Sequence, residues 1–187
     1  MSHLIRKLVT TENAPKPVAP YSQAVIWDRT LYVSGVLGLD KDTMKMVAGG
    51  AVAEARQALI NLGNVLAAGD SGYDKVIKTT ILLQDITDFA AVNEVYKEFF
   101  PIDYPARTAY EVANLPLNAK VEIEVIAGTG DVSTMHKCHK LEEEGCNISK
   151  FRRRSRVQRP QIPSNADSSK SDGFYFETNG RASGVLD

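Results

Sequence analysis

The chain has 187 residues, of which 22 are basic and 23 acidic, so its formal charge is −1. This length suits one globular domain with a further segment. No stretch approaches the roughly 20 consecutive apolar residues that cross a bilayer, and the first residues lack the apolar segment of a secretory signal peptide. The sequence therefore argues against a membrane protein and a secreted one, and its near-neutral charge provides no long-range attraction for nucleic acid or anionic lipid.

The composition changes near residue 130, which divides the chain into a predicted domain, residues 1–130, and a predicted tail, residues 131–187. The first part has a net charge of −3, no cysteine, and His3 as its one histidine, whereas the second has a net charge of +2 and both cysteines. This excludes Ser-His-Asp and Cys-His nucleophiles, imidazole or thiolate metal ligands and disulfides from the first part. Its chemistry must use carboxylates, guanidinium groups, hydroxyls and the backbone.

Three short strands are predicted first, at residues 5–9, 22–27 and 31–36, from their apolar and β-branched composition. A proline-rich loop separates the first two strands. Asp28-Arg29 joins the second strand to the third, and this short connection suits a tight hairpin.

Two helices are predicted at residues 51–69 and 89–99, where apolar residues recur at helical spacing. Between them, residues 75–83 have the composition of a central strand buried on both faces. Two further strands are predicted at residues 107–112 and 120–127. This order of elements predicts an α+β fold, a single mixed sheet with both helices on one face.

The sheet face without helices is expected to mediate self-association. Its residues alternate with those that face the helices, and they are partly apolar. A domain of about 130 residues buries a limited share of its surface, so covering this face with another copy is the economical solution.

Two carboxylates, Glu122 and Glu124, lie in the last predicted strand. Because side chains alternate along a strand, both point to the same face, about 7 Å apart. A solvated sheet face is the simpler interpretation of such a pair. A glycosidase is a poor one, because its two carboxylates flank the scissile bond from opposite sides.

Other candidate residues occupy restricted backbone contexts. Arg107 follows a proline-delimited loop, and its planar guanidinium suits bidentate capture of a carboxylate or phosphate. Ser34 and Gly35 interrupt a strand, where a glycine indicates a bulge or the close approach of another backbone or a ligand. Tyr21 follows a proline, and Asn93 lies on the second predicted helix. Taken singly, each also has an ordinary structural interpretation as an ion-pair, packing, turn or surface residue.

These residues lie in motifs that follow one another in a fixed order. The motifs are Ala19-Pro20-Tyr21-Ser22-Gln23-Ala24, Tyr32-Val33-Ser34-Gly35, Lys78-Thr79-Thr80, Asp88-Phe89 with Val92-Asn93, Pro105-Ala106-Arg107 and Val121-Glu122-Ile123-Glu124. Together they resemble the Rid (YjgF) family of reactive intermediate imine deaminases, over residues 5–127. The resemblance implies a chorismate-mutase-like subunit in a homotrimer, with the sheets lining a central barrel and clefts between subunits.

The resemblance also implies an activity, the hydrolysis of enamine and imine intermediates such as 2-aminoacrylate and 2-iminobutanoate to 2-keto acids and ammonia. By the same resemblance, Arg107 would bind the substrate carboxylate, and Glu122 would position water or carry a proton to the leaving nitrogen. The cleft would be shaped by Tyr21 of a neighbouring subunit, Ser34, Gly35 and Asn93. An imine is already electrophilic, so neither a metal nor an organic cofactor is expected.

The chain departs from the family pattern at two positions. Val36 replaces the glutamine that usually follows Ser-Gly, which removes a polar group near the cleft and leaves the substrate preference open. Ala109 stands where many bacterial relatives have a cysteine.

The predicted tail has no sustained periodicity, and we expect it to be mostly disordered. Its metal-ligand types are His136, Cys138, His139 and Cys146, in a spacing that matches no standard zinc site. A basic cluster at residues 150–159 suits a solvated tail, a nuclear-localisation segment or a weak RNA contact.

Three functional hypotheses follow, of which the leading one is an imine deaminase in the cytoplasm, with the mitochondrion and nucleus as alternative locations. The second is an RNA-associated translation inhibitor or endoribonuclease. The third, a non-enzymatic binder of small carboxylates or a chaperone-like partner, would use Arg107 without Glu122.

Overall fold

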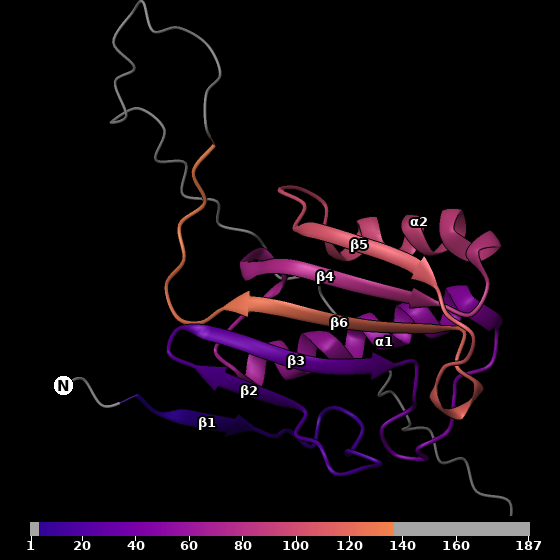
Figure 1. Cartoon of the computed structure of the whole chain (residues 1–187), viewed down its shortest axis with the longest axis horizontal. Coiled ribbons are helices and arrows are strands. Elements are labelled where there is room, and N and C mark those ends of the chain that lie inside the picture. Colours follow the sequence, from indigo (N-terminus) through magenta and orange to yellow (C-terminus); the bar gives the residue numbers. More distant parts are fainter. Residues whose placement is uncertain (1–3, 137–187) are drawn as a thin grey trace, which may run out of the picture. The chain divides into compact units, whose positions relative to one another are not determined.

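A computed structural model describes residues 4–136 of the chain, all within one compact unit, Met1–His136. Six strands form a single sheet in the order β1-β2-β3-β6-β4-β5, and two helices pack against it (Figure 1). The elements in chain order are β1 (Arg6–Val9), β2 (Ala24–Trp27), β3 (Thr30–Leu37), α1 (Gly50–Ala68), β4 (Val76–Leu83), α2 (Phe89–Phe99), β5 (Ala106–Glu111) and β6 (Val121–Gly128).

The sheet is mixed, because β4 and β5 run parallel while every other neighbouring pair is antiparallel. A parallel pair requires a crossover connection, and α2 provides it. The last strand, β6, lies between β3 and β4 in the middle of the sheet. Both helices lie on the same side of the sheet in Figure 1, so the predicted α+β arrangement is confirmed.

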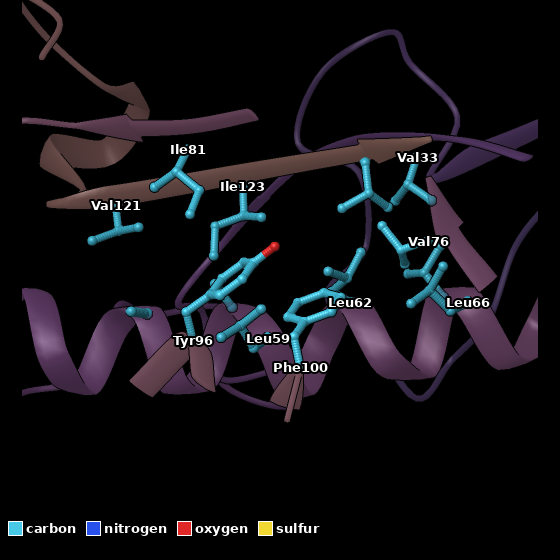
Figure 2. Packing of buried hydrophobic residues seen from close by; sticks show 14 of the residues in the cluster. Val33, Leu59, Leu62, Leu66, Val76, Ile81, Tyr96, Phe100, Val121 and Ile123 are labelled. Carbon is cyan, nitrogen blue, oxygen red and sulfur yellow. The ribbon is translucent and has the colours of Figure 1, made fainter. Parts of the chain in front are cut away.

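The core fills the space between the sheet and the two helices. In Figure 2, side chains from the strands point toward those of the helices, and the labelled residues are Val33, Leu59, Leu62, Leu66, Val76, Ile81, Tyr96, Phe100, Val121 and Ile123. Burial of this apolar surface is the main force that holds the helices on the sheet. A buried amide adds a specific tie, since Asn61 Nδ2 of α1 donates to the carbonyl oxygens of Leu37 and Leu39 at 3.1 and 2.8 Å.

Strand alternation gives the sheet two different faces. On β6, Val121, Ile123 and Val125 are buried against the helices, whereas Glu122 and Glu124 point to the other side. We call this other side the open face. Its residues include Leu8, Val25, Trp27, Tyr32, Leu82, Tyr110, Glu122, Glu124 and Ile126.

The predicted burial of residues 75–83 on both faces is wrong for the single chain. Thr79, Ile81 and Leu83 of β4 are buried, but the residues between them are only half-buried, and Ile77 is 57% exposed. The composition of a doubly buried strand is therefore present, but residues 4–136 provide no cover for it on the open face. The part of the chain that the structure describes contains no helix long and apolar enough to cross a membrane.

Candidate active site

Arg107 is the second residue of β5, and its side chain enters an open pocket of about 420 Å³ at the edge of α2. The walls come from α2, including Asn93 and Lys97, and from the preceding loop, including Tyr104 and Pro105. The structure therefore brings two of the predicted site residues, Asn93 and Arg107, into one pocket.

Within residues 4–136, no neighbouring carboxylate neutralises the charge of Arg107. Lys97, the other cation of the pocket, forms an ion pair with Glu94 at 2.7 Å. Among residues 4–136, no carboxylate lies within ion-pair distance of Arg107. The guanidinium instead lies over two aromatic rings, 4.9 Å from the ring centre of Tyr96 and 5.4 Å from that of Phe89. Its donors are therefore available to an anionic ligand.

Glu122 lies on the open face, beside an irregularity in the neighbouring strand. The register of β3 and β6 shifts between Val33 and Val36, as expected for a bulge. Gly35 lies in this bulge, and a Cβ atom added there would overlap with the Glu122 carboxylate. The predicted bulge at Gly35 is confirmed. The group that comes close is the Glu122 side chain, and glycine is needed because this carboxylate occupies the space of a Cβ atom.

The environment of Glu122 favours its protonated form. Burial raises the pKa of the Glu122 carboxyl above its ordinary value, and the nearby charge of Glu124 raises this pKa further. Loss of hydration and a like charge both penalise the ionised carboxylate. A carboxyl whose pKa moves toward neutrality exchanges protons more readily at physiological pH.

Ser34, which precedes Gly35 in the bulge, is held by two hydrogen bonds to the segment that follows Tyr21. Ser34 Oγ donates to the carbonyl oxygen of Ser22 at 2.7 Å, and the Ser34 N–H donates to that of Gln23 at 3.1 Å. Tyr21, which precedes Ser22 in the chain, is 44% exposed. These contacts fix Ser34 at the bulge and leave the Tyr21 ring accessible.

The sequence interpretation missed Gln23, which organises the proline-rich loop. Its side-chain amide accepts from the Thr11 N–H at 2.7 Å and donates to the carbonyl oxygens of Thr11 and Pro15 at 3.1 and 2.9 Å. Gln23 is buried, and a polar residue inside a predicted strand is the signal that could have identified it.

The predicted catalytic residues lie on opposite faces of one sheet. Arg107 pairs with Thr79 of β4, whose side chain is buried under the helices, whereas Glu122 pairs with Leu82, which points to the open face. Asn93 thus accompanies Arg107, and Ser34 and Gly35 accompany Glu122. A single chain does not bring the two groups to one small ligand.

The described residues provide no evident metal centre. Among residues 4–136, no three side chains of His, Cys, Asp or Glu gather as potential ligands. Of the tail residues considered as ligands, His136 is described, where it lies 3.4 Å from Asp103, and the three that follow it lie outside the described residues. The basic cluster at residues 150–159 also lies outside them.

Comparison with known proteins assigns the domain to a family. The family model described as endoribonuclease L-PSP matches residues 11–129. The chain belongs to this family. The resemblance to Rid (YjgF) proteins noted in the sequence is thereby confirmed.

Three related proteins match the family domain along nearly their whole length. The RutC family protein UK114 of Drosophila melanogaster is 63% identical over 134 residues, which cover 72% of this chain and 97% of that protein. The 2-iminobutanoate/2-iminopropanoate deaminase of Homo sapiens is 48% identical over 134 residues, covering 72% and 98%. The crystal structure of E. coli TdcF with bound serine matches with a TM-score of 0.63 at 35% identity, covering 66% of this chain and 99% of TdcF.

Proposed function

We propose that this chain is an imine deaminase that hydrolyses small enamine and imine carboxylates, such as 2-aminoacrylate and 2-iminobutanoate, to 2-keto acids and ammonia. The Arg107 guanidinium, which lies in an open pocket and has no carboxylate partner among residues 4–136, is the observation that carries this proposal. An arginine without a carboxylate partner suits bidentate binding of a substrate carboxylate. Relatives that match along nearly their whole length and are named 2-iminobutanoate/2-iminopropanoate deaminases support the same substrate class.

The reaction needs one group that accepts and returns a proton. Water attacks the carbon of the protonated imine, the C=N π bond breaks as the new C–O bond forms, and the ionised Glu122 accepts one proton from the water. The carboxyl then gives this proton to the amine nitrogen, and ammonia leaves as the C–N bond breaks. The remaining hydroxyl proton passes to the Glu122 carboxylate as the carbonyl forms, and solvent takes it up to restore the ionised carboxylate. The raised pKa of Glu122 favours both halves of this cycle near neutral pH.

The site is proposed to form between two copies of the chain in a homotrimer. The Arg107 pocket of one subunit would face the Glu122 region of its neighbour, together with Ser34, Gly35 and Tyr21 on that side. Two features support this assembly: the predicted catalytic groups lie on opposite faces of one sheet, and the open face exposes Leu8, Tyr32 and Tyr110. A second copy would cover these apolar residues and complete the site.

The RNA-associated activity remains the alternative. The family description names an endoribonuclease, and the basic cluster at residues 150–159 would supply the phosphate contacts. Deletion of that cluster separates the two functions. RNA binding through it would disappear with the deletion and weaken with salt, whereas imine hydrolysis would persist.

The deaminase proposal can be tested by generating 2-iminobutanoate in place with a threonine dehydratase. The readout is the fraction of imine that semicarbazide traps, because an imine deaminase lowers that fraction. We expect the parent protein and Arg56→Ala, a change at an exposed arginine of α1 that pairs with Glu98, to suppress trapping, and Arg107→Ala to lose this effect. A correctly assembled parent without suppression would refute deamination of this imine.

The cytoplasmic location, with mitochondrial or nuclear alternatives, is a separate proposal that cell fractionation tests.

A further inference from the structure

The aromatic surroundings of Arg107 are not explained by core packing alone. Phe89 and Tyr96 stand seven residues apart on α2, which is about two helical turns, so they share one helix face. Both rings lie under the Arg107 guanidinium, with distances of 5.4 and 4.9 Å from its central carbon to the ring centres. Phe89 is 38% exposed, so its ring is not required to fill the core.

The Tyr96 ring is itself held on two sides. Its hydroxyl forms a hydrogen bond with Thr79 Oγ1 at 3.1 Å, and its ring stacks on Phe100 with 4.4 Å between the ring centres and 21° between the planes. Thr79 is also the strand partner of Arg107 across β4 and β5. Thr79 therefore relates the two groups, because it forms a hydrogen bond with the Tyr96 hydroxyl and lies opposite Arg107 in the sheet.

A guanidinium held by aromatic rings differs from one held by a carboxylate. A carboxylate partner would occupy the N–H donors and neutralise the charge, and a substrate carboxylate would have to displace it. An aromatic face attracts the cation through its quadrupole and leaves the N–H groups at the edge of the guanidinium plane unoccupied. Stacking thus orders a long, flexible side chain without consuming its binding capacity.

We propose that Tyr96, assisted by Phe89, is a positioning residue that sets the orientation of Arg107 for the substrate carboxylate. The inference rests on the proposed function of Arg107 as the carboxylate anchor and adds a determinant of its affinity. The two rings act through Arg107, so their loss weakens carboxylate binding more than it slows the chemical step.

The experiment measures KM and kcat for 2-iminobutanoate and, separately, the Kd of 2-oxobutanoate by titration calorimetry. The keto acid carries the same carboxylate and needs no catalysis for its binding to be measured. The variants are Tyr96→Leu, Tyr96→Phe and Phe89→Leu. Tyr73→Leu is the matched control, because the Tyr73 ring packs against the same Phe100 at 5.4 Å without contacting Arg107.

For Tyr96→Leu we expect KM and Kd to rise roughly 3- to 30-fold, the range of a cation–π contact, with a smaller change in kcat. Phe89→Leu should raise both by roughly 2- to 5-fold because this ring is partly exposed. Tyr96→Phe should recover most of the affinity lost in Tyr96→Leu, since it keeps the ring. Tyr73→Leu should lower the melting temperature without a comparable rise in Kd.

Equal Kd values for Tyr96→Leu, Phe89→Leu and the Tyr73→Leu control would overturn the inference and leave the proposed function intact if the parent hydrolyses the imine. A parent that binds 2-oxobutanoate without hydrolysis would refute the proposed function, and the order of Kd values would still decide the inference. A parent that neither binds nor hydrolyses would overturn both. If Tyr96→Leu fails to fold, the test uses Phe89→Leu, at the start of α2. A Kd of 2-oxobutanoate above that of Tyr73→Leu would then support the inference, and an equal Kd would overturn it.

Discussion

The two halves of the candidate site are built in opposite ways. The Arg107 half lies on the helix side of the sheet, where aromatic rings hold a permanent charge that has no carboxylate partner among residues 4–136. The Glu122 half lies on the open face, where burial and a second carboxylate raise the pKa of a group that must change its charge. Binding needs a fixed charge, whereas proton transfer needs a charge that is easily altered, and each half provides one of these properties.

The largest effect is expected from the loss of the Glu122 carboxyl, the proposed carrier of the proton. Glu122→Gln keeps the shape of the side chain and removes its proton exchange, so we expect kcat to fall about 10²- to 10⁴-fold with a small change in KM. Steady-state kinetics on 2-iminobutanoate measures this. A Glu122→Gln protein with parental kcat would show that proton transfer does not depend on the open face.

The second largest effect is expected from the loss of Arg107, the proposed binding residue for the substrate carboxylate. Arg107→Ala removes the cation that faces the substrate carboxylate, and we expect kcat/KM to fall about 30- to 1,000-fold, mostly through KM. The same kinetics, with 2-oxobutanoate binding as a second readout, measures the change. An Arg107→Ala loss confined to kcat would contradict the division into a binding half and a proton-transfer half.

A smaller effect is expected from Gly35→Ala, which tests the geometry of the bulge. The added Cβ would overlap with the Glu122 carboxylate and displace it. Because a displacement of about 1 Å can cost up to 10²-fold in rate, we expect kcat to fall about 10- to 100-fold. Gly50→Ala is the comparison, because a Cβ atom there would meet no atom within 4 Å. Its positive φ of 73° strains the backbone, so this variant should lose stability while it keeps the parental kcat. Parental kcat in Gly35→Ala would contradict the close packing of Glu122.

The smallest effects concern pH. Glu124→Gln removes the charge that adds to the raised pKa of Glu122, so the acid limb of the kcat/KM profile should move to lower pH.

Because folding raises the pKa of Glu122, its contribution to the free energy of unfolding is largest below the unfolded pKa and declines as pH rises through the folded pKa. Glu122→Gln should therefore gain stability relative to the parent at neutral pH compared with pH 4, as thermal melting would show. An unchanged difference would contradict the raised pKa.

The sequence predicts the fold well because the period of apolar residues is a local property. The helices at Gly50–Ala68 and Phe89–Phe99 and the alternation in Val121–Gly128 follow from it, with boundaries that shift by one or two residues. The order of the strands, with β6 between β3 and β4, depends on long-range pairing that periodicity does not encode.

The site was only partly predictable for a similar reason. The motifs identify Arg107 and Glu122, but their separation on two sheet faces depends on the register of β4 with its neighbours. Tyr96 falls at an ordinary core position of an amphipathic helix, so its contact with Arg107 carries no sequence signal. Gln23 is similar: its loop contacts are visible only once the proline-rich segment is folded.

The central claim is that one site contains Arg107 of one copy and Glu122 of another. Mixing Arg107→Ala with Glu122→Gln subunits, by co-expression or by joint refolding, tests it most directly. If the site forms between subunits, random pairing in closed assemblies restores about a quarter of the parental sites, and activity rises far above that of either variant alone. If each chain contains a complete site, every subunit in the mixture keeps its own defect. Activity equal to the average of the two variants would then contradict the account.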